Sequence, residues 1–255
     1  MRLFRTLAAR FQNLFYPGLS DESVNIFKLL KTPLLTRIPR WIGVLQPDAV
    51  KNLFRVDHAE WALLAASAEK LGSSGSTDGI EFCSRFPEAE EFRLSAFPAV
   101  GNYTRRTGRY LNWRYFDIPR HNYRSVRNAA DGFAIYRIEQ IAGQGASFIR
   151  ILEWNFAGDS AEKALRFIIG NEQRSNPVLL DFFCSAEKVG AELQKLGFIE
   201  ETGLASRIPY LIRPINYHDG IALGIDLPPH RSERSLDFSD WYLTKGDGDI
   251  DRIKL

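Results

Sequence analysis

The feature that most constrains the fold of this chain is a short, nearly continuous apolar run, Val178 to Phe183, that follows Pro177. A strand covered by helices on both faces has this composition, because none of its side chains must face water. Apolar residues at helical spacing stand on both sides of the run, from Ala161 before it and from Ala186 after it. The pattern therefore predicts a buried strand between two helices.

Residues that commonly begin or end helices stand at the edges of both helical patterns. Asp159 and Ser160 precede the first pattern, and Ser185 precedes the second. Side chains of these types are typical N-terminal caps. Gly197 follows the second pattern, as expected where a helix ends. We therefore expect both helices to begin at these polar residues.

A hairpin is predicted before this unit. Residues 133–140 and 147–154 have strand composition, and Gly143-Gln144-Gly145 stands between them as a turn. A further strand is expected over residues 207–213. The order of hairpin, helix, strand, helix and strand predicts an α/β fold with a mixed sheet.

The charge balance bounds the kind of partner. The chain has Lys+Arg 33 against Asp+Glu 31, so no global field favours nucleic acid. Its two cysteines, Cys83 and Cys184, cannot build a disulfide framework, which suits a reducing compartment. Its apolar runs are far shorter than the roughly 20 residues of a transmembrane helix. We expect a cytoplasmic protein that acts on a small molecule.

A metal site is not expected. Asp247, Asp249 and Asp251 alternate like the start of a calcium loop, but Arg252 stands where such a loop needs glycine. Cys184, at the end of the buried strand, is expected to be an inert buried thiol.

The N-terminal segment leaves two readings open. Residues 1–16 place their apolar side chains on one side of a helix: Leu3, Phe4, Leu7, Phe11, Leu14 and Phe15. Such a helix either packs on the rest of the chain or lies at a membrane surface.

A second organisational signal lies between residues 57 and 79. Asp57 and Glu60 begin a predicted helix over residues 61–71, and Gly72 ends it. Residues 73–79 have linker composition. We therefore place a boundary here, with an N-terminal region over residues 1–79 and a main domain over residues 80–255.

The chain also contains a weak internal repeat. Residues 36–42 read Thr-Arg-Ile-Pro-Arg-Trp-Ile, and residues 206–212 read Ser-Arg-Ile-Pro-Tyr-Leu-Ile. Self-similarity at this separation suggests duplicated domains.

Three segments of the sequence resemble a known family. Residues 191–198 read Ala-Glu-Leu-Gln-Lys-Leu-Gly-Phe, residues 111–115 read Leu-Asn-Trp-Arg-Tyr, and residues 240–252 form an aromatic and acidic tail. Together they resemble the C-terminal half of bacterial tandem proteins of the GNAT (acyl-CoA N-acyltransferase) superfamily, some of which are associated with cell-surface polysaccharide genes. The resemblance covers roughly residues 105–255. It implies a mixed, mostly antiparallel central sheet flanked by helices, with residues 20–50 as the last strands of a preceding GNAT domain.

The resemblance also implies an activity. In this superfamily the fourth strand splays from the fifth, acyl-CoA lies between them as co-substrate, and the next helix holds the pyrophosphate at its N-terminus. The matching residues here are Asn155, Gly158 and Ser160. The loop has a single glycine, and Leu193 stands where the family has tyrosine. A non-catalytic GNAT-like substrate-binding or structural module that partners an intact acyltransferase domain is therefore the alternative to an N-acyltransferase. The expected partner is a GNAT domain or, in a homodimer, a second copy of the chain.

Glu153 is the candidate general base, because it lies near the end of the predicted fourth strand. Tyr217 and His218 are candidates for an acid or a substrate contact. The alternatives are a paired carboxylate for Glu153 and turn residues for the other two.

Two further groups are candidates for binding. Arg105, Arg106 and Arg109 form a local basic patch, either for CoA phosphates or as a solvated loop. Sugars are bound by aromatic faces and charged hydrogen-bonding groups. A pocket for a sugar- or amino-acid-like acceptor is therefore predicted from seven residues: Trp113, Arg114, Trp241, Tyr242, Asp247, Asp249 and Arg252.

Overall fold

A computed structural model of the chain describes most of the residues between 14 and 247. The described ranges are 14–17, 21–29, 34–35, 38–94, 97, 101–119, 121–130, 132–141, 143–206, 208–209, 223–226, 238 and 241–247.

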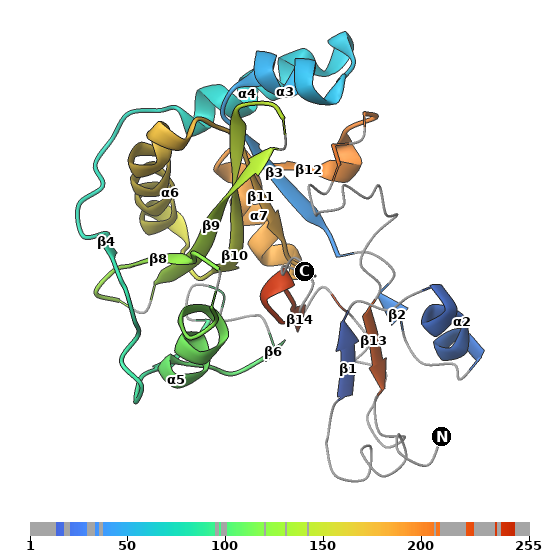
Figure 1. Cartoon of the computed structure of the whole chain (residues 1–255), viewed down its shortest axis with the longest axis vertical. Helices are drawn as coiled ribbons and strands as arrows, with labels where there is room; N and C mark the ends of the chain where they lie inside the picture. Colours follow the sequence, from blue (N-terminus) through green and yellow to red (C-terminus); the bar gives the residue numbers. More distant parts are fainter. Residues whose placement is uncertain are drawn as a thin grey trace.

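The centre of the molecule is a seven-stranded sheet with strand order β12-β3-β11-β10-β9-β8-β4 (Figure 1). Its strands are β3 (Arg40–Val44), β4 (Glu81–Phe82), β8 (Arg124–Arg127), β9 (Phe133–Ile141), β10 (Ala146–Trp154), β11 (Pro177–Phe183) and β12 (Ile199–Glu200). Within this sheet β10 and β11 run parallel, and the other neighbouring strands are antiparallel. The predicted mixed, mostly antiparallel sheet is confirmed.

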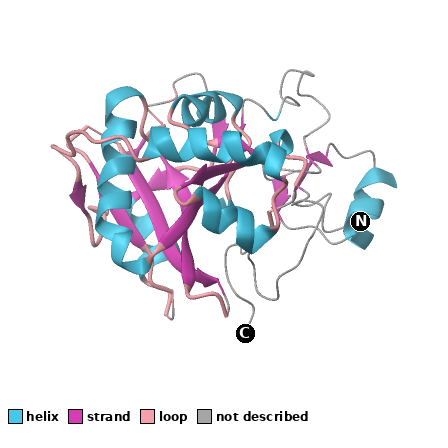
Figure 2. Cartoon of the chain, turned by 90° about the horizontal axis from the view of Figure 1, so that it is seen from above, coloured by secondary structure: helices cyan, strands magenta, loops and turns pink. Residues whose placement is uncertain are grey.

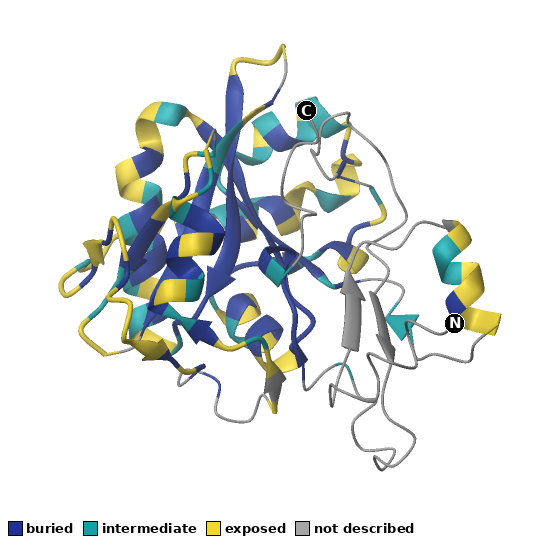
Figure 3. Ribbon diagram, turned by 60° about the horizontal axis from the view of Figure 1, so that its bottom comes forward, coloured by how far each residue is buried: buried dark blue, intermediate teal, exposed yellow. Residues whose placement is uncertain are grey.

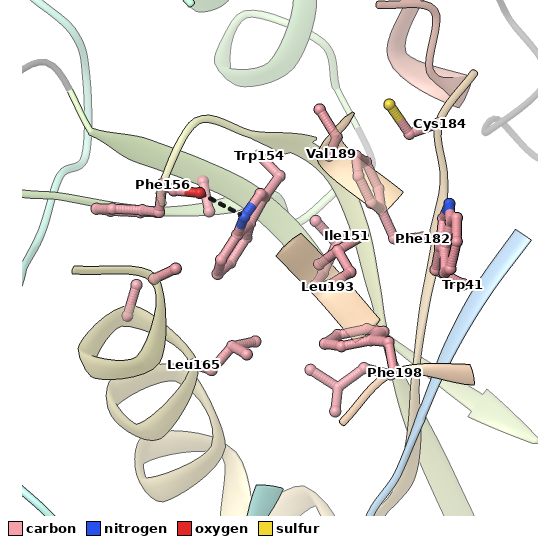
Figure 4. Packing of buried hydrophobic residues seen from close by; sticks show 14 of the residues in the cluster. Trp41, Ile151, Trp154, Phe156, Leu165, Phe182, Cys184, Val189, Leu193 and Phe198 are labelled. Atoms are coloured by element: carbon pink, nitrogen blue, oxygen red, sulfur yellow. Dashed lines mark hydrogen bonds between the residues drawn. The ribbon is translucent and has the colours of Figure 1, made fainter. Parts of the chain in front are cut away.

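Two helices cover one face of the sheet. Helix α6 (Gly158–Glu172) and helix α7 (Glu187–Lys195) pack their apolar sides on inward-facing residues of β10, β11 and β3. Figure 4 shows Leu165 of α6 and Leu193 of α7 in the same core as Ile151. The predicted buried strand is confirmed, because every residue of β11 is buried, but the two helices that flank it in the sequence both lie on this one face.

The other face is covered by several shorter elements. Helix α3 (Pro47–Phe54) joins one cluster, and helix α5 (Gly108–Leu111) with the π-helical turn η2 (Asn112–Phe116) joins another. Helix α4 (Trp61–Leu71) follows the 3₁₀ turn η1 (His58–Glu60) and packs against β3. Figures 2 and 3 show helices around the sheet, whose strands are largely buried.

Short elements complete the chain. They are β5 (Glu91–Phe92), β6 (Asn102–Tyr103), β7 (Arg106–Thr107), β14 (Trp241–Tyr242) and the 3₁₀ turns η3 (Gln173–Ser175), η4 (Glu201–Gly203) and η7 (Lys245–Asp247). None of the described helices combines the length and apolar character needed to cross a bilayer.

A small second sheet lies to one side of the central sheet in Figure 1. It has the order β1-β13-β2, from β1 (Leu14–Pro17), β13 (Leu223–Asp226) and β2 (Leu34–Leu35), and it lies near α2 (Asp21–Leu29). The predicted N-terminal helix is wrong over its last residues, because residues 14–16 pair with β13 as a strand. Residues 1–13 of that prediction lie outside the described residues.

The region before residue 79 contributes to the central sheet. Strand β3 lies between β11 and β12 and pairs with both of them. Residues 21–29 form helix α2, so the expectation of strands over residues 20–50 is wrong there. The sheet is thus built from both predicted regions, and the origin of residues 1–79 in a preceding domain stays a prediction.

The predicted helix starts need correction. Helix α6 begins at Gly158 after Ala157, and α7 begins at Glu187 after Ala186; neither start has a side-chain cap. The Ser160 hydroxyl instead donates to the Ala157 carbonyl at 2.9 Å. The Ser185 hydroxyl accepts from the Leu243 amide at 3.0 Å rather than from the first turn of α7.

The predicted turn at residues 143–145 and the predicted helix end at Gly197 are confirmed. Gly143, Gly145 and Gly197 have φ of 73°, 61° and 102°, which glycine adopts at little cost. Of the strand predicted over residues 207–213, the structure describes residues 208 and 209 alone, and neither lies in a strand.

Candidate active site

The parallel strands β10 and β11 separate before they end. Their pairing runs from Ser147 and Pro177 to Ile151 and Phe182. Beyond that point β10 continues through Trp154 without pairing with β11. We call the space between residues 152–154 of β10 and residues 183–185, which end β11 and follow it, the fork.

A β-bulge turns the end of β10. Ile151 pairs with Tyr136 of β9 and Glu153 pairs with the adjacent Ile135, so Leu152 is the extra residue. A bulge shifts the alternation of side chains between the two faces of a sheet. Trp154 consequently joins Ile151 in the core beneath α6 and α7, and its indole nitrogen donates to the Phe156 carbonyl (Figure 4). The same shift directs Glu153 away from that core.

The Glu153 carboxylate is fully buried among polar groups. The Tyr115 hydroxyl donates to its Oε1 at 2.8 Å, and the Tyr242 hydroxyl lies 3.3 Å from its Oε2. Arg106 donates from Nε and Nη2 at 3.3 Å. Burial raises the pKa of Glu153, although Arg106 opposes the rise. The carboxyl group is therefore biased towards holding a proton.

Arg106 has a shorter contact to a second carboxylate. Its Nη2 donates to Asp247 at 2.8 and 2.9 Å, and Asp247 also accepts from the Thr244 amide at 2.9 Å. Burial alone would lower the pKa of Arg106, but the carboxylates of Asp247 and Glu153 raise it above its ordinary value. One permanent cation thus holds together the end of β10 and the turn η7.

The C-terminal segment 241–247 occupies the fork. The Cys184 backbone forms an antiparallel bridge with Thr244, and the Ser185 amide donates to the Leu243 carbonyl at 3.1 Å. Across the fork, the Tyr242 hydroxyl accepts from the Trp154 amide at 2.8 Å. The segment therefore fills the separation between the strand ends with protein groups.

A pocket lies beside the start of α6. It has a volume of about 360 Å³ and is formed by the end of α4, the first half of α6 and the end of α7. Its polar lining includes Lys70, Arg166 and Lys195 beside Gly158. Glu162 and Glu192 pair with two of these cations, as Arg166–Glu162 and Lys195–Glu192.

The predicted cofactor-binding residues lie between the end of β10 and the first turn of α6. Gly158 is the first residue of α6 and has a φ of 55°. Asn155 is buried, and its amide nitrogen donates to the Arg93 carbonyl at 2.8 Å. Ser160 lies in the first turn of α6. Their role in binding acyl-CoA stays a prediction.

Most of the described residues of the predicted acceptor pocket come together. The Arg114 Nε donates to the Gly246 carbonyl at 2.9 Å, and Trp241, Tyr242 and the Asp247 carboxylate are buried nearby. Trp113 is 61% exposed and packs on Tyr110. Tyr217, His218, Asp249 and Arg252 lie outside the described residues.

Sequence reasoning missed the central role of Arg106. We expected Arg105, Arg106 and Arg109 to form one basic patch, and this is wrong for Arg106, whose side chain is fully buried. Arg105 is exposed and pairs with Glu91. Arg105 precedes the two-residue strand β7 and Arg106 is its first residue, so no periodic pattern marked which arginine is buried.

Tyr115 and Lys245 were also missed. Both are buried beside charged groups, Tyr115 at Glu153 and Lys245 with its Nζ 4.0 Å from Asp181. No local pattern marks either residue, because their partners are distant in sequence.

Comparison with known proteins gives distant structural similarity alone. No family model matches the sequence, and no curated protein matches it. A conserved protein of unknown function from Enterococcus faecalis V583, described as a probable N-acyltransferase, matches with a TM-score of 0.47 and 10% identity. The match covers 89% of this chain and 48% of that protein, so this chain spans about half its length.

A second similar structure is a functionally unknown conserved protein from Staphylococcus epidermidis ATCC 12228. It matches with a TM-score of 0.34 and 10% identity, over 89% of this chain and 77% of that one. Both scores are too low to establish a shared fold, and no residue role is transferred from either protein.

Proposed function

We propose that this chain is a GNAT-type N-acyltransferase that transfers an acyl group from acyl-CoA to an amino group of a sugar- or amino-acid-like acceptor. The observation that carries the proposal is the fork, where two parallel strands separate at a bulge and a buried carboxylate stands at the opening. A separated strand pair offers backbone amides and carbonyls to an extended ligand that contains amide groups.

Glu153 is proposed as the general base. Burial raises the pKa of its carboxyl group, which brings its proton affinity closer to that needed to accept a proton from an amine. The amine nitrogen would form a bond to the thioester carbonyl carbon while the carbon–sulfur bond breaks. The amine proton would pass to Glu153, and the departing thiolate would take up a proton from an acid. Tyr217 and His218 are the donors predicted from the sequence.

The pocket beside α6 is the proposed place for the phosphate groups. The first amides of a helix lack partners within the helix and favour anions, and Lys70 lines the pocket together with Arg166 and Lys195, which pair with Glu162 and Glu192 in the free protein. Gly158 allows close approach of a ligand, because no atom lies within 4 Å of the position a Cβ would take. In this proposal the helix amides and Lys70 would hold the phosphates in place of a glycine-rich loop.

A non-catalytic GNAT-like module is the second candidate. The observation that favours it is the filling of the fork by residues 241–247, with Glu153 held by Arg106 and Tyr115. Asp159 also places negative charge in the first turn of α6. In this role the domain would bind an acceptor for a partner domain that carries out the transfer.

The release of free thiol from acetyl-CoA, in the presence of amino sugars and amino acids, separates the two candidates. We expect acceptor-dependent thiol release by the wild type and at least a tenfold lower rate for Glu153→Gln. The exposed Glu88→Gln variant is the matched control and keeps the wild-type rate. No acceptor-dependent release by the wild type, or equal rates for Glu153→Gln and the wild type, would contradict catalysis by this carboxylate.

A further inference from the structure

We propose that residues 241–247 are a displaceable plug of the fork, held by the Arg106–Asp247 ion pair as a latch, and that the plug competes with any extended ligand that enters between β10 and β11. What enters the fork rests on the proposed function. The opening of the plug is independent of the proposed function, because the plug opens in the protein without a ligand.

The contact between the plug and β10 is made by a side chain. The Tyr242 hydroxyl accepts from the Trp154 amide at 2.8 Å and lies 3.1 Å from the Trp154 carbonyl oxygen. A paired strand would use its own amide and carbonyl for these two bonds. A ligand with an amide group can therefore replace the Tyr242 hydroxyl at Trp154 without breaking a backbone ladder between β10 and the plug.

The other contacts of the plug combine apolar burial with polar bonds, because Trp241, Tyr242 and Leu243 are buried and β14 pairs with β6. The Leu243 amide donates to the Ser185 hydroxyl at 3.0 Å, and the same hydroxyl donates to the Trp241 carbonyl. The Arg114 Nε donates to the Gly246 carbonyl, and Arg106 holds Asp247. The polar contacts are exchanged for water at modest cost, so the main cost of opening is the exposure of the three buried side chains, of which Tyr242 belongs to the core beneath α6 and α7.

One residue of the plug opposes its closed position. Lys245 is 1% exposed, and its Nζ has no hydrogen-bond partner among the described residues. The Nζ lies 3.7 Å from the centre of the Phe183 ring and 4.0 Å from Asp181, a carboxylate already paired with Arg40 and Arg150. A buried amine without a hydrogen-bond partner gives up its hydration for weaker contacts, here an aromatic ring and a carboxylate at 4.0 Å. Release of the plug would restore that hydration.

Cys184 provides a direct reporter of the opening. Its thiol is buried, its backbone pairs with Thr244 of the plug, and Cys83 is the chain's other cysteine. In a Cys83→Ser background, modification by N-ethylmaleimide therefore reports exposure of the fork. Mass spectrometry of the free protein, below the onset of urea unfolding, gives the rate.

Two variants should change this rate in opposite directions. Asp247→Asn weakens the latch, and we expect Cys184 to react about tenfold faster. Lys245→Met keeps an unbranched chain over Phe183 and removes the buried amine, and we expect about tenfold slower reaction. Ile168→Val, in α6 and remote from the plug, is the control that weakens the core and leaves the rate unchanged.

The result that would overturn the plug is a rate that follows global stability. If the rates of all three variants track their urea stabilities, Cys184 is reached through global unfolding. An unchanged Cys184 modification rate in Asp247→Asn would also contradict the proposal that the Arg106–Asp247 ion pair holds the plug. Absence of acyl-CoA binding, with opposite effects of the two variants intact, would contradict the proposed function and leave the plug standing.

Discussion

The Tyr242 hydroxyl bonds to the backbone amide of Trp154 at 2.8 Å, although the two residues are 88 positions apart in the sequence. This contact places the C-terminal segment between the ends of the two parallel strands. Tyr242 therefore has two opposing effects: its hydroxyl stabilises the folded protein, and the same hydroxyl occupies the proposed ligand site.

The variant Tyr242→Phe separates those effects. Loss of the hydroxyl leaves the buried Trp154 amide without its partner, and we expect the free energy of unfolding to fall by about 1–3 kcal/mol. The same change removes a competitor from the fork, so acetyl-CoA binding should become tighter. Weaker binding would show instead that Tyr242 takes part in holding the ligand.

Arg106 should be far more important to stability than its neighbour. Arg106→Met leaves Glu153 and Asp247 buried without their cation, which we expect to cost about 3–5 kcal/mol. The adjacent Arg105, 71% exposed in its pair with Glu91, is the control, and Arg105→Met should cost less than about 1 kcal/mol. Urea unfolding measures both. Similar losses for the two variants would contradict the buried network.

Glu153 should make stability depend on pH. Its pKa is raised in the folded protein, so the folded state holds the proton more tightly than the unfolded state. This contribution to stability is present below the ordinary pKa of glutamate and is lost as pH rises through the raised value.

Glu153→Gln removes this titration. Its stability relative to the wild type should therefore improve between acidic and neutral pH, by about 1.4 kcal/mol for each unit of the shift. Urea unfolding across that range provides the measurement. Parallel stability curves for the two proteins would show that Glu153 is not perturbed.

Two helical glycines should respond differently to alanine. A Cβ at Gly190 of α7 would lie 2.1 Å from the Trp41 ring of β3, whereas one at Gly170 of α6 would meet nothing within 4 Å. We expect Gly190→Ala to destabilise by about 1–3 kcal/mol and Gly170→Ala to stabilise by up to about 1 kcal/mol. Thermal unfolding tests the pair, and equal shifts would contradict the close packing of α7 on β3.

Much of the second half of the fold could be predicted because its signals are local. The hairpin, the helix α6 and the apolar strand β11 each carry a periodicity that neighbouring residues set. Strand β3 could not be placed, because its pairing with β11 joins residues about 140 positions apart.

The two copies of the weak internal repeat contact each other in the structure, which the sequence did not reveal. Arg40, in the first copy, donates to the carbonyls of Ile208 and Pro209 in the second copy, at 2.6 and 3.1 Å. The two similar segments therefore lie in contact. Glu153 was identified from its place near a strand end, but its partners Arg106 and Tyr115 come from segments with no pattern that marks them.

The most direct test of the account is a calorimetric titration of the full chain with acetyl-CoA, with the five tryptophans as a parallel fluorescence signal. The account predicts saturable binding at micromolar concentrations, weakened by free CoA and strengthened by Tyr242→Phe. The absence of binding at millimolar acetyl-CoA, in both the wild type and Tyr242→Phe, would contradict an acyl-CoA site in the fork.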